Sequence, residues 1–199
     1  MASFLDQFTK TSKVISNFKR KISDAGNWFR SNVRRLGGKE PEKRWTREEL
    51  LARYEKTEEP TIGSLVLFFY DPKFKKTLPY YDRFPLSIIV CPAEKGFHGL
   101  NTHYLPPEIR AKLFDALLDL STDKKLTERR RLELTYGMLK GSSKLKYFKP
   151  TYKSYLTSHI DSKIVIVPPE EWSNVLFLPL QHFKKATAQE VWKDSRSKF

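Results

Sequence analysis

The sequence predicts an α+β protein, with a small antiparallel sheet or half-barrel of three or four strands packed with C-terminal helices, and a long basic amphipathic helix in front. Three observations predict this class. Hydrophobic residues make up 39% of the 199 residues and aromatic residues 14%, enough to bury a core. Short apolar runs bounded by Pro and Gly fill residues 61–107. Beyond them the apolar residues recur with a period of about 3.6, which is typical of helices.

Residues 1–38 are predicted to form a basic amphipathic helical arm. Apolar residues repeat there at seven-residue intervals in a strong row and a weaker one, and Gly37 and Gly38 end the helix. The helix either docks on its own domain, acts as a coiled-coil or protein-binding arm, or lies at a membrane interface. Polar Thr11 and Asn32 in the weaker row argue against a coiled coil. The residues expected to contact a partner protein are Phe8, Ile15, Phe18, Ile22 and Phe29.

Residues 39–60 are predicted to be a linker with a short helix, and residues 61–199 an α+β core domain. Thr46 and Glu49 form a capping box that starts a helix running to about Thr57. The apolar runs at 65–70, 85–90 and 96–104 are predicted strands. Their tight connections favour antiparallel pairing.

The C-terminal half is predicted to be mainly helical. One helix begins near Pro107 and continues to Leu120, and a second runs from Thr127 to Gly141. A short helical segment is expected at 152–158, a strand at 164–167, and a turn or short helix around Trp172. A second capping box, Thr187 with Glu190, predicts a final helix to about Ser195.

Several classes of protein are disfavoured by simple features of the chain. No run reaches the roughly 18 apolar residues that a membrane span requires. The first residues lack the charged and apolar regions of a secretory signal, and the single Cys91 can form neither an intramolecular disulfide nor a Cys-based zinc site. We expect a soluble protein made in a reducing compartment, with no membrane partner.

The net charge of +14, with a pI near 9.8, predicts an anionic partner. Residues 140–153 hold five lysines and no acid, and aromatic residues alternate with them. Lysines neutralise phosphates and aromatic faces stack on exposed bases, so this block indicates nucleic acid, although basic blocks are often only solvated faces. The candidate DNA-binding residues are Arg129, Arg130, Arg131, Lys140, Lys144, Lys146, Tyr147, Phe148, Lys149 and Lys153.

The residues offer little for catalysis, and no metal site or cofactor is predicted. His98 and His103 do not have the spacing of a helical zinc pair and are interpreted as structural. Cys91 is interpreted as a buried thiol rather than a nucleophile. Asp71, Glu94 and Lys95 match a nuclease-like acidic pattern only in a generic way, and neither a phosphate-binding loop nor a nucleophile elbow is present. An enzyme is disfavoured.

The most distinctive residues lie between 70 and 113. They comprise Tyr70-Asp71-Pro72, the run from Leu78 to Leu86, Gly96 to Asn101, His103 to Pro107, and Arg110 to Leu113. Structurally, the prolines and glycines fix turns, the aromatic residues supply a core, and Asp82 and Arg83 satisfy turn backbone or pair locally. Over residues 60–195 the chain resembles the DNA end protector proteins of T-even-like tailed bacteriophages, including their cyanobacterial relatives. The basic N-terminus is in keeping with that family.

The resemblance implies a virion protein that binds the ends of packaged linear duplex DNA and shields them from host exonuclease after injection. It implies no catalytic residue. Such a protein would reside in the virion, and in the host cytoplasm during assembly and after injection. The alternative is a structural tail, baseplate or neck component that docks to other virion proteins through the N-terminal helix. A nuclease is a third, weaker alternative.

Overall fold

The computed structural model describes residues 45–107, 109–110, 113–114, 137, 141, 146–168, 171–172, 175 and 178–197. The predicted N-terminal helix lies outside the described residues, as do the linker up to residue 44 and most of the two helices predicted between 107 and 141. Where those two helices are described, at 107, 109–110, 113–114 and 137, the chain is helical, as the sequence predicts.

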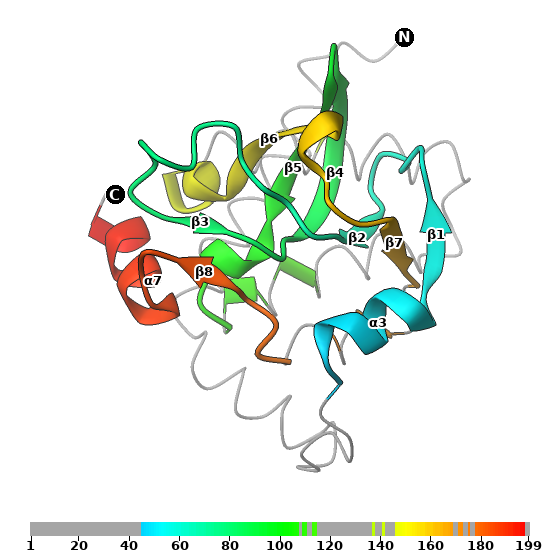
Figure 1. Cartoon of the computed structure of the whole chain (residues 1–199). Coiled ribbons are helices and arrows are strands. Elements are labelled where there is room, and N and C mark those ends of the chain that lie inside the picture. Colours follow the sequence, from blue (N-terminus) through cyan, green and yellow to red (C-terminus); the bar gives the residue numbers. More distant parts are fainter. Residues whose placement is uncertain are drawn as a thin grey trace, which may run out of the picture.

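A six-stranded sheet with the order β1-β7-β2-β4-β5-β6 forms the centre of the described chain (Figure 1). Every neighbouring pair in it is antiparallel. The strands are β1 (Glu55–Thr57), β2 (Leu65–Leu67), β4 (Leu86–Ala93), β5 (Gly96–Asn101), β6 (Tyr152–Leu156) and β7 (Ile164–Val167). A separate ribbon pairs β3 (Tyr81–Asp82) with β8 (Phe183–Lys184).

The α+β class and antiparallel pairing are confirmed, but the prediction of three or four strands is wrong. The two additional strands are β1 and β6, both of which fall in segments predicted to be helical. In β6 the larger residues Tyr152, Tyr155 and Leu156 have the i, i+3, i+4 spacing of a helix face. Pairing with β5 over five residue positions overrides that local preference. In the same way, β1 pairs with β7 over Glu55–Thr57. The helix that precedes it, α3 (Arg47–Arg53), therefore stops before Tyr54 rather than running to Thr57.

Strand β4 also runs further than predicted, past Pro92 to Ala93. A central strand is hydrogen-bonded to a neighbour on each side, and proline has no N–H to donate to either neighbour. On its β2 side, β4 is paired from Leu86 as far as Ile88. Two further backbone hydrogen bonds join Ile89 to the 63–64 turn. Pro92 therefore lies beyond the end of that pairing, in the hairpin with β5, where proline is tolerated.

Both faces of the sheet are buried at β2, which explains the continuous apolar run in this strand. Leu65 and Leu67 pack in the larger core cluster with α3, through Leu50, and with Trp172. Val66, between them, faces a smaller cluster with Phe68, Phe97 and Tyr155. Alternating residues of one strand thus serve two cores, since successive side chains point to opposite faces. Figure 1 shows α3 lying against the end of the sheet that carries β1 and β7.

Two capping boxes predicted from the sequence are present. Thr46 and Glu49 cap α3 reciprocally, with bonds of 3.2 and 2.8 Å. Thr187 and Glu190 do the same for α7 (Ala188–Ser197), with bonds of 3.3 and 2.7 Å. The α7 helix contacts two 3-10 turns, η1 (Thr102–Tyr104) and η2 (Lys146–Thr151), and a third turn, η3 (Thr157–His159), follows β6.

Candidate nucleic-acid interface

A buried carboxylate joins three separate parts of the chain at the β3–β8 ribbon. One oxygen of Asp82 accepts bonds from the backbone N–H groups of Phe84 (3.1 Å) and His182 (3.0 Å). The other oxygen lies 3.1 Å from the amide nitrogen of Asn101, which donates to it, and 2.7 Å from Nδ1 of His103. All the acceptor positions of this carboxylate are therefore occupied within the fold.

The protonation of this cluster follows from its burial. Burial acts to raise the pKa of Asp82, but His103 and the hydrogen bonds to the carboxylate outweigh it and hold the pKa below its usual range. Burial lowers the pKa of His103, and Asp82 only partly opposes that effect. The carboxylate is thus ionised and the imidazole neutral at pH 7, with Nδ1–H donating to Asp82. His103 is structural, as predicted.

The other residues considered for catalysis also take structural positions. The ring of His98 stacks on Tyr152 at 5.4 Å, and its Nδ1 lies 2.8 Å from Ser154 Oγ. Cys91 is half-buried rather than buried as predicted, and its sulfur lies 3.9 Å from the Tyr152 hydroxyl. Within the described part of the chain, no three His, Cys, Asp or Glu side chains gather as a metal site would need.

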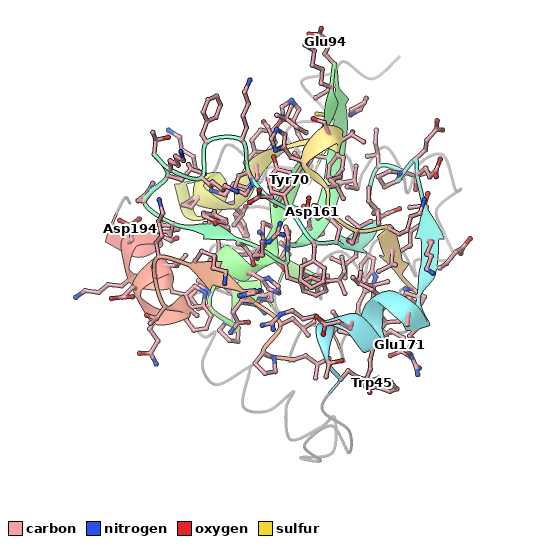
Figure 2. The ribbon with its side chains drawn as sticks, viewed as in Figure 1. Trp45, Tyr70, Glu94, Asp161, Glu171 and Asp194 are labelled. Atoms are coloured by element: carbon pink, nitrogen blue, oxygen red, sulfur yellow. The ribbon has the colours of Figure 1, made fainter. Side chains whose placement is uncertain are left out.

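The generic acidic pattern is also separated in space. Glu94 lies at the outer tip of the β4–β5 hairpin (Figure 2). Asp71 instead follows Tyr70, which Figure 2 labels well away from Glu94, and it pairs with Lys75 at 2.6 Å. These two acids do not form a nuclease-like pair.

A pocket of about 370 Å³ lies between the 70–82 segment and strands β5 and β6. Six of its fourteen lining residues are aromatic: Tyr70, Phe74, Tyr80, Tyr81, Tyr104 and Tyr155. Tyr70 and Tyr155 meet edge to face at 5.0 Å, and Tyr80 lies 6.0 Å from Tyr104. The inner rings, Tyr104 and Tyr155, are almost fully buried, whereas Phe74 is 64% exposed. The pocket therefore has a buried inner end and an exposed outer edge.

Two lysines also line this pocket. Lys153, on β6, places its ammonium 4.0 Å from the centre of the Tyr104 ring. Lys73, beside Phe74, is exposed, with its ammonium 5.5 Å from that ring. Burial raises the pKa of Tyr80 and of Tyr104 well above the usual value, so both phenols stay neutral. The pocket thus combines neutral aromatic rings with positive charge.

Lys185 fixes the segment that carries Lys73 and Phe74. Its ammonium donates to the carbonyls of Lys75 (2.7 Å), Lys76 (3.0 Å) and Leu78 (2.9 Å). Lys185 also has a φ of 68°, a left-handed conformation that side chains other than glycine rarely adopt. Tyr80 adds a second attachment by donating from its hydroxyl to Asp194 of α7. Figure 1 shows this segment, the β3–β8 ribbon and α7 on the same side of the molecule.

The sequence-predicted DNA contacts are placed only in part. Lys149 is exposed on η2 and Lys153 is half-buried on β6, four residues further along. Lys146 and Tyr147 belong to η2, and their side chains are outside the described parts. Phe148 is fully buried in the larger core cluster, so its ring has no face for a base and the predicted stacking role is wrong. Outside the described residues lie Arg129, Arg130, Arg131, Lys140 and Lys144, and the arm residues Phe8, Ile15, Phe18, Ile22 and Phe29.

The aromatic pocket was not predicted as a site from the sequence. Its residues come from three segments, 70–82, 101–104 and 153–156, which only the fold brings together. The sequence signal was nevertheless present, because Lys73, Lys75 and Lys76 surround Phe74 as lysines surround aromatic residues at 140–153.

A second groove, of about 710 Å³, runs between the 58–62 turn and the β4–β5 hairpin. It is lined by Ile62, Ile89 and Phe97, with Glu58 and Glu59 among its lining residues. Two carboxylates repel a phosphate backbone, so this groove is not a candidate for nucleic acid.

Comparison with known proteins identifies the family. No curated protein and no solved structure matches the chain. In the described part of the chain, no helix has the length and apolar character to cross a bilayer. The family model described as phage T4 terminal DNA protecting protein matches residues 3–195, nearly the whole sequence, so the chain belongs to the family of phage terminal DNA protecting proteins.

Proposed function

We propose that this protein binds the ends of linear duplex DNA, independently of base sequence, and shields them from exonuclease. The match to the terminal DNA protecting family over residues 3–195 is the observation that carries the proposal. The net charge of +14 supports it, since a phosphate backbone is the partner that such a charge suits.

The binding is attributed to phosphate contacts. Phosphate contacts carry no sequence information, whereas base-edge contacts in a groove do. The proposed contacts are Arg129, Arg130, Arg131, Lys140, Lys144, Lys146, Lys149 and Lys153, with Tyr147 as a stacking residue. The folded body would then block the duplex terminus sterically. No catalytic step is part of this proposal.

The proposed location is the virion, and the host cytoplasm during assembly and after injection. Apolar residues from the two rows of residues 1–38 are the proposed contact with other virion proteins: Phe8, Ile15, Phe18, Ile22 and Phe29. Deletion of residues 1–36 should then weaken incorporation into particles and leave DNA-end binding largely intact.

The test compares linear with covalently closed circular duplex of equal length and sequence, across a salt series, with resistance to exonuclease as a second readout. We expect preferential binding to the linear form, protection of its ends, and no cleavage. Equal and weak binding to both forms that disappears at physiological salt would contradict end binding. The positive charge would then serve a protein partner.

A further inference from the structure

The aromatic pocket has a feature that the fold does not require. Phe74 is 64% exposed, on a segment with Lys73, Lys75 and Lys76, although Tyr155 and Tyr104 at the inner end are nearly buried. An exposed phenyl ring at the edge of an aromatic pocket makes no contribution to the core. It is, however, a suitable surface for a flat ligand to stack on.

The pocket has the size and chemistry for one nucleotide. Its volume of about 370 Å³ lies within the range of small-molecule sites, roughly 300–1,000 Å³. Aromatic rings stack on any base, because every base has a π-face, and lysines bind the phosphates that connect the bases. Lys73 and Lys153 provide that charge beside Phe74 and Tyr104.

The acidic group in the pocket wall, Asp82, does not oppose such a ligand strongly. Asp82 is 4% exposed, and both of its oxygens are occupied by donors from Phe84, His182, Asn101 and His103. The positive charge reaches the outer edge, where Lys73 is exposed. A base would therefore occupy the aromatic interior, and its phosphate would lie toward the lysines.

We propose that this pocket takes the terminal nucleotide of a DNA end, unstacked from the duplex, with its base among the tyrosine rings and Phe74 and its phosphate beside Lys73 and Lys153. This inference rests on the proposed function and adds a reason for end selectivity. Extruding an internal base costs a few kcal/mol in lost stacking and pairing. A terminal base has only one stacking neighbour, so its removal costs less, whatever the sequence. Ends are thereby distinguished from internal duplex without any base-specific contact.

The experiment uses the full chain and linear duplexes with 5-iodouracil either at the terminal nucleotide or at an internal position, cross-linked by light and mapped by mass spectrometry. We expect the terminal probe to attach to residues of the pocket wall, such as Phe74 or Tyr81, and the internal probe not to attach there. We expect Phe74→Ala, at an exposed position that leaves the core intact, to weaken binding to linear DNA about tenfold and binding to circular DNA little. Ile62→Ala, at an exposed position on the acidic groove, is the matched control and should change neither affinity.

Two negative results have separate meanings. If the wild-type chain prefers ends, but Phe74→Ala keeps that preference and the terminal probe attaches elsewhere, the pocket assignment is overturned and end binding stands. If the wild-type chain shows no preference for linear DNA, the proposed function fails, and the assignment of a terminal nucleotide to this pocket fails with it.

Discussion

At the scale of single residues, Asp82 is the side chain on which most of the site geometry depends. It ties the β3–β8 ribbon to Asn101 at the end of β5 and to His103 in η1, and it lies in the wall of the aromatic pocket. The sequence predicts that Asp82 satisfies turn backbone, and it does so through Phe84 N–H. Its links to Asn101 and His182 depend on tertiary contacts that local sequence does not show.

We expect Asp82→Asn to lower the free energy of unfolding by about 3 kcal/mol. The amide has one acceptor oxygen in place of two, so buried donors are left without their partner, and a lost hydrogen bond to a buried charged group costs about 1.5–3 kcal/mol. Thermal unfolding should show a Tm lower by roughly 6–12 °C for a chain of this size. Asp161→Asn, which alters the exposed pair with Arg83, is the control and should change Tm little. Equal Tm values for both variants would contradict the role given to Asp82.

The pH dependence of stability follows from His103 and Asp82. The pKa of His103 is lower in the folded than in the unfolded chain, where it is about 6.5. Between these two values the unfolded chain binds more protons, so stability falls as the pH drops below about 6.5. Asp82, whose pKa is also lowered, removes further stability as the pH falls below about 4 and through its folded pKa. His182, whose pKa is lowered mainly by burial, adds to the loss below pH 6.5.

His103→Asn should reduce the pH sensitivity of Tm between pH 7 and 5. Its amide nitrogen can replace Nδ1 as a donor to Asp82 but does not titrate. The variant will be less stable overall, so the comparison is the slope of Tm against pH and not its absolute value. Slopes identical to those of the wild-type chain would show that His103 does not titrate differently on folding.

At the scale of elements, sequence patterns predicted most of the described structure where local preference and tertiary packing agree. The strand at 164–167 and both capping boxes were located to the residue, because β-branched residues and Thr-x-x-Glu spacing act locally. Strands β1 and β6 were missed for the opposite reason. Each is made by pairing with a strand distant in sequence, β1 with β7 and β6 with β5.

The candidate site was harder to predict than the fold. Phe148 matched the alternation of lysines and aromatic residues that is typical of nucleic-acid contacts, yet it is buried in the core. Charge patterns locate a basic segment but not which side of its turn faces solvent. The aromatic pocket is formed by three distant segments, so its chemistry emerges only after β5 pairs with β6 and the 70–82 segment covers them.

Lys185→Met tests whether Lys185 fixes the 70–82 segment, which forms one side of the aromatic pocket. The substitution removes three bonds to the carbonyls of Lys75, Lys76 and Leu78 and leaves the strained backbone without compensation. We expect faster tryptic cleavage within residues 73–76 under native conditions, since proteolysis follows local opening. Lys184→Met, at the neighbouring exposed position, is the control and should be cleaved there at the wild-type rate. Equal rates in the two variants would mean that the segment is fixed by other interactions, such as Tyr80 with Asp194.

At the scale of the whole molecule, two kinds of surface are combined in one chain. The positive charge is concentrated in blocks, with five lysines and no acid at 140–153, whereas Glu58 and Glu59 line the groove at the 58–62 turn. In the proposed mode of binding, the basic block attracts the phosphates of DNA and the two glutamates of the groove repel them. Charge alone does not distinguish a DNA end from internal duplex. The aromatic pocket is the proposed means of distinguishing them, so mutation of the pocket and mutation of the basic block should have separate effects on end preference and on affinity.

Charge reversal of Lys144, Lys146 and Lys149 should abolish binding to linear and circular DNA alike without lowering Tm, because phosphate contacts contribute affinity and not specificity. In the wild-type chain, log K should fall linearly with log salt concentration, with a slope of about −0.9 for each phosphate neutralised. Milder changes of the same lysines to Gln should reduce the steepness of that slope by roughly one for each lysine that binds a phosphate. Lys163→Glu, at an exposed lysine paired with Glu58, is the matched control and should leave the slope unchanged. Phe74→Ala should have the complementary effect: it should remove the preference for DNA ends and leave the salt dependence of the affinity unchanged. A triple reversal that still binds DNA would place the phosphate-binding residues elsewhere on the molecule.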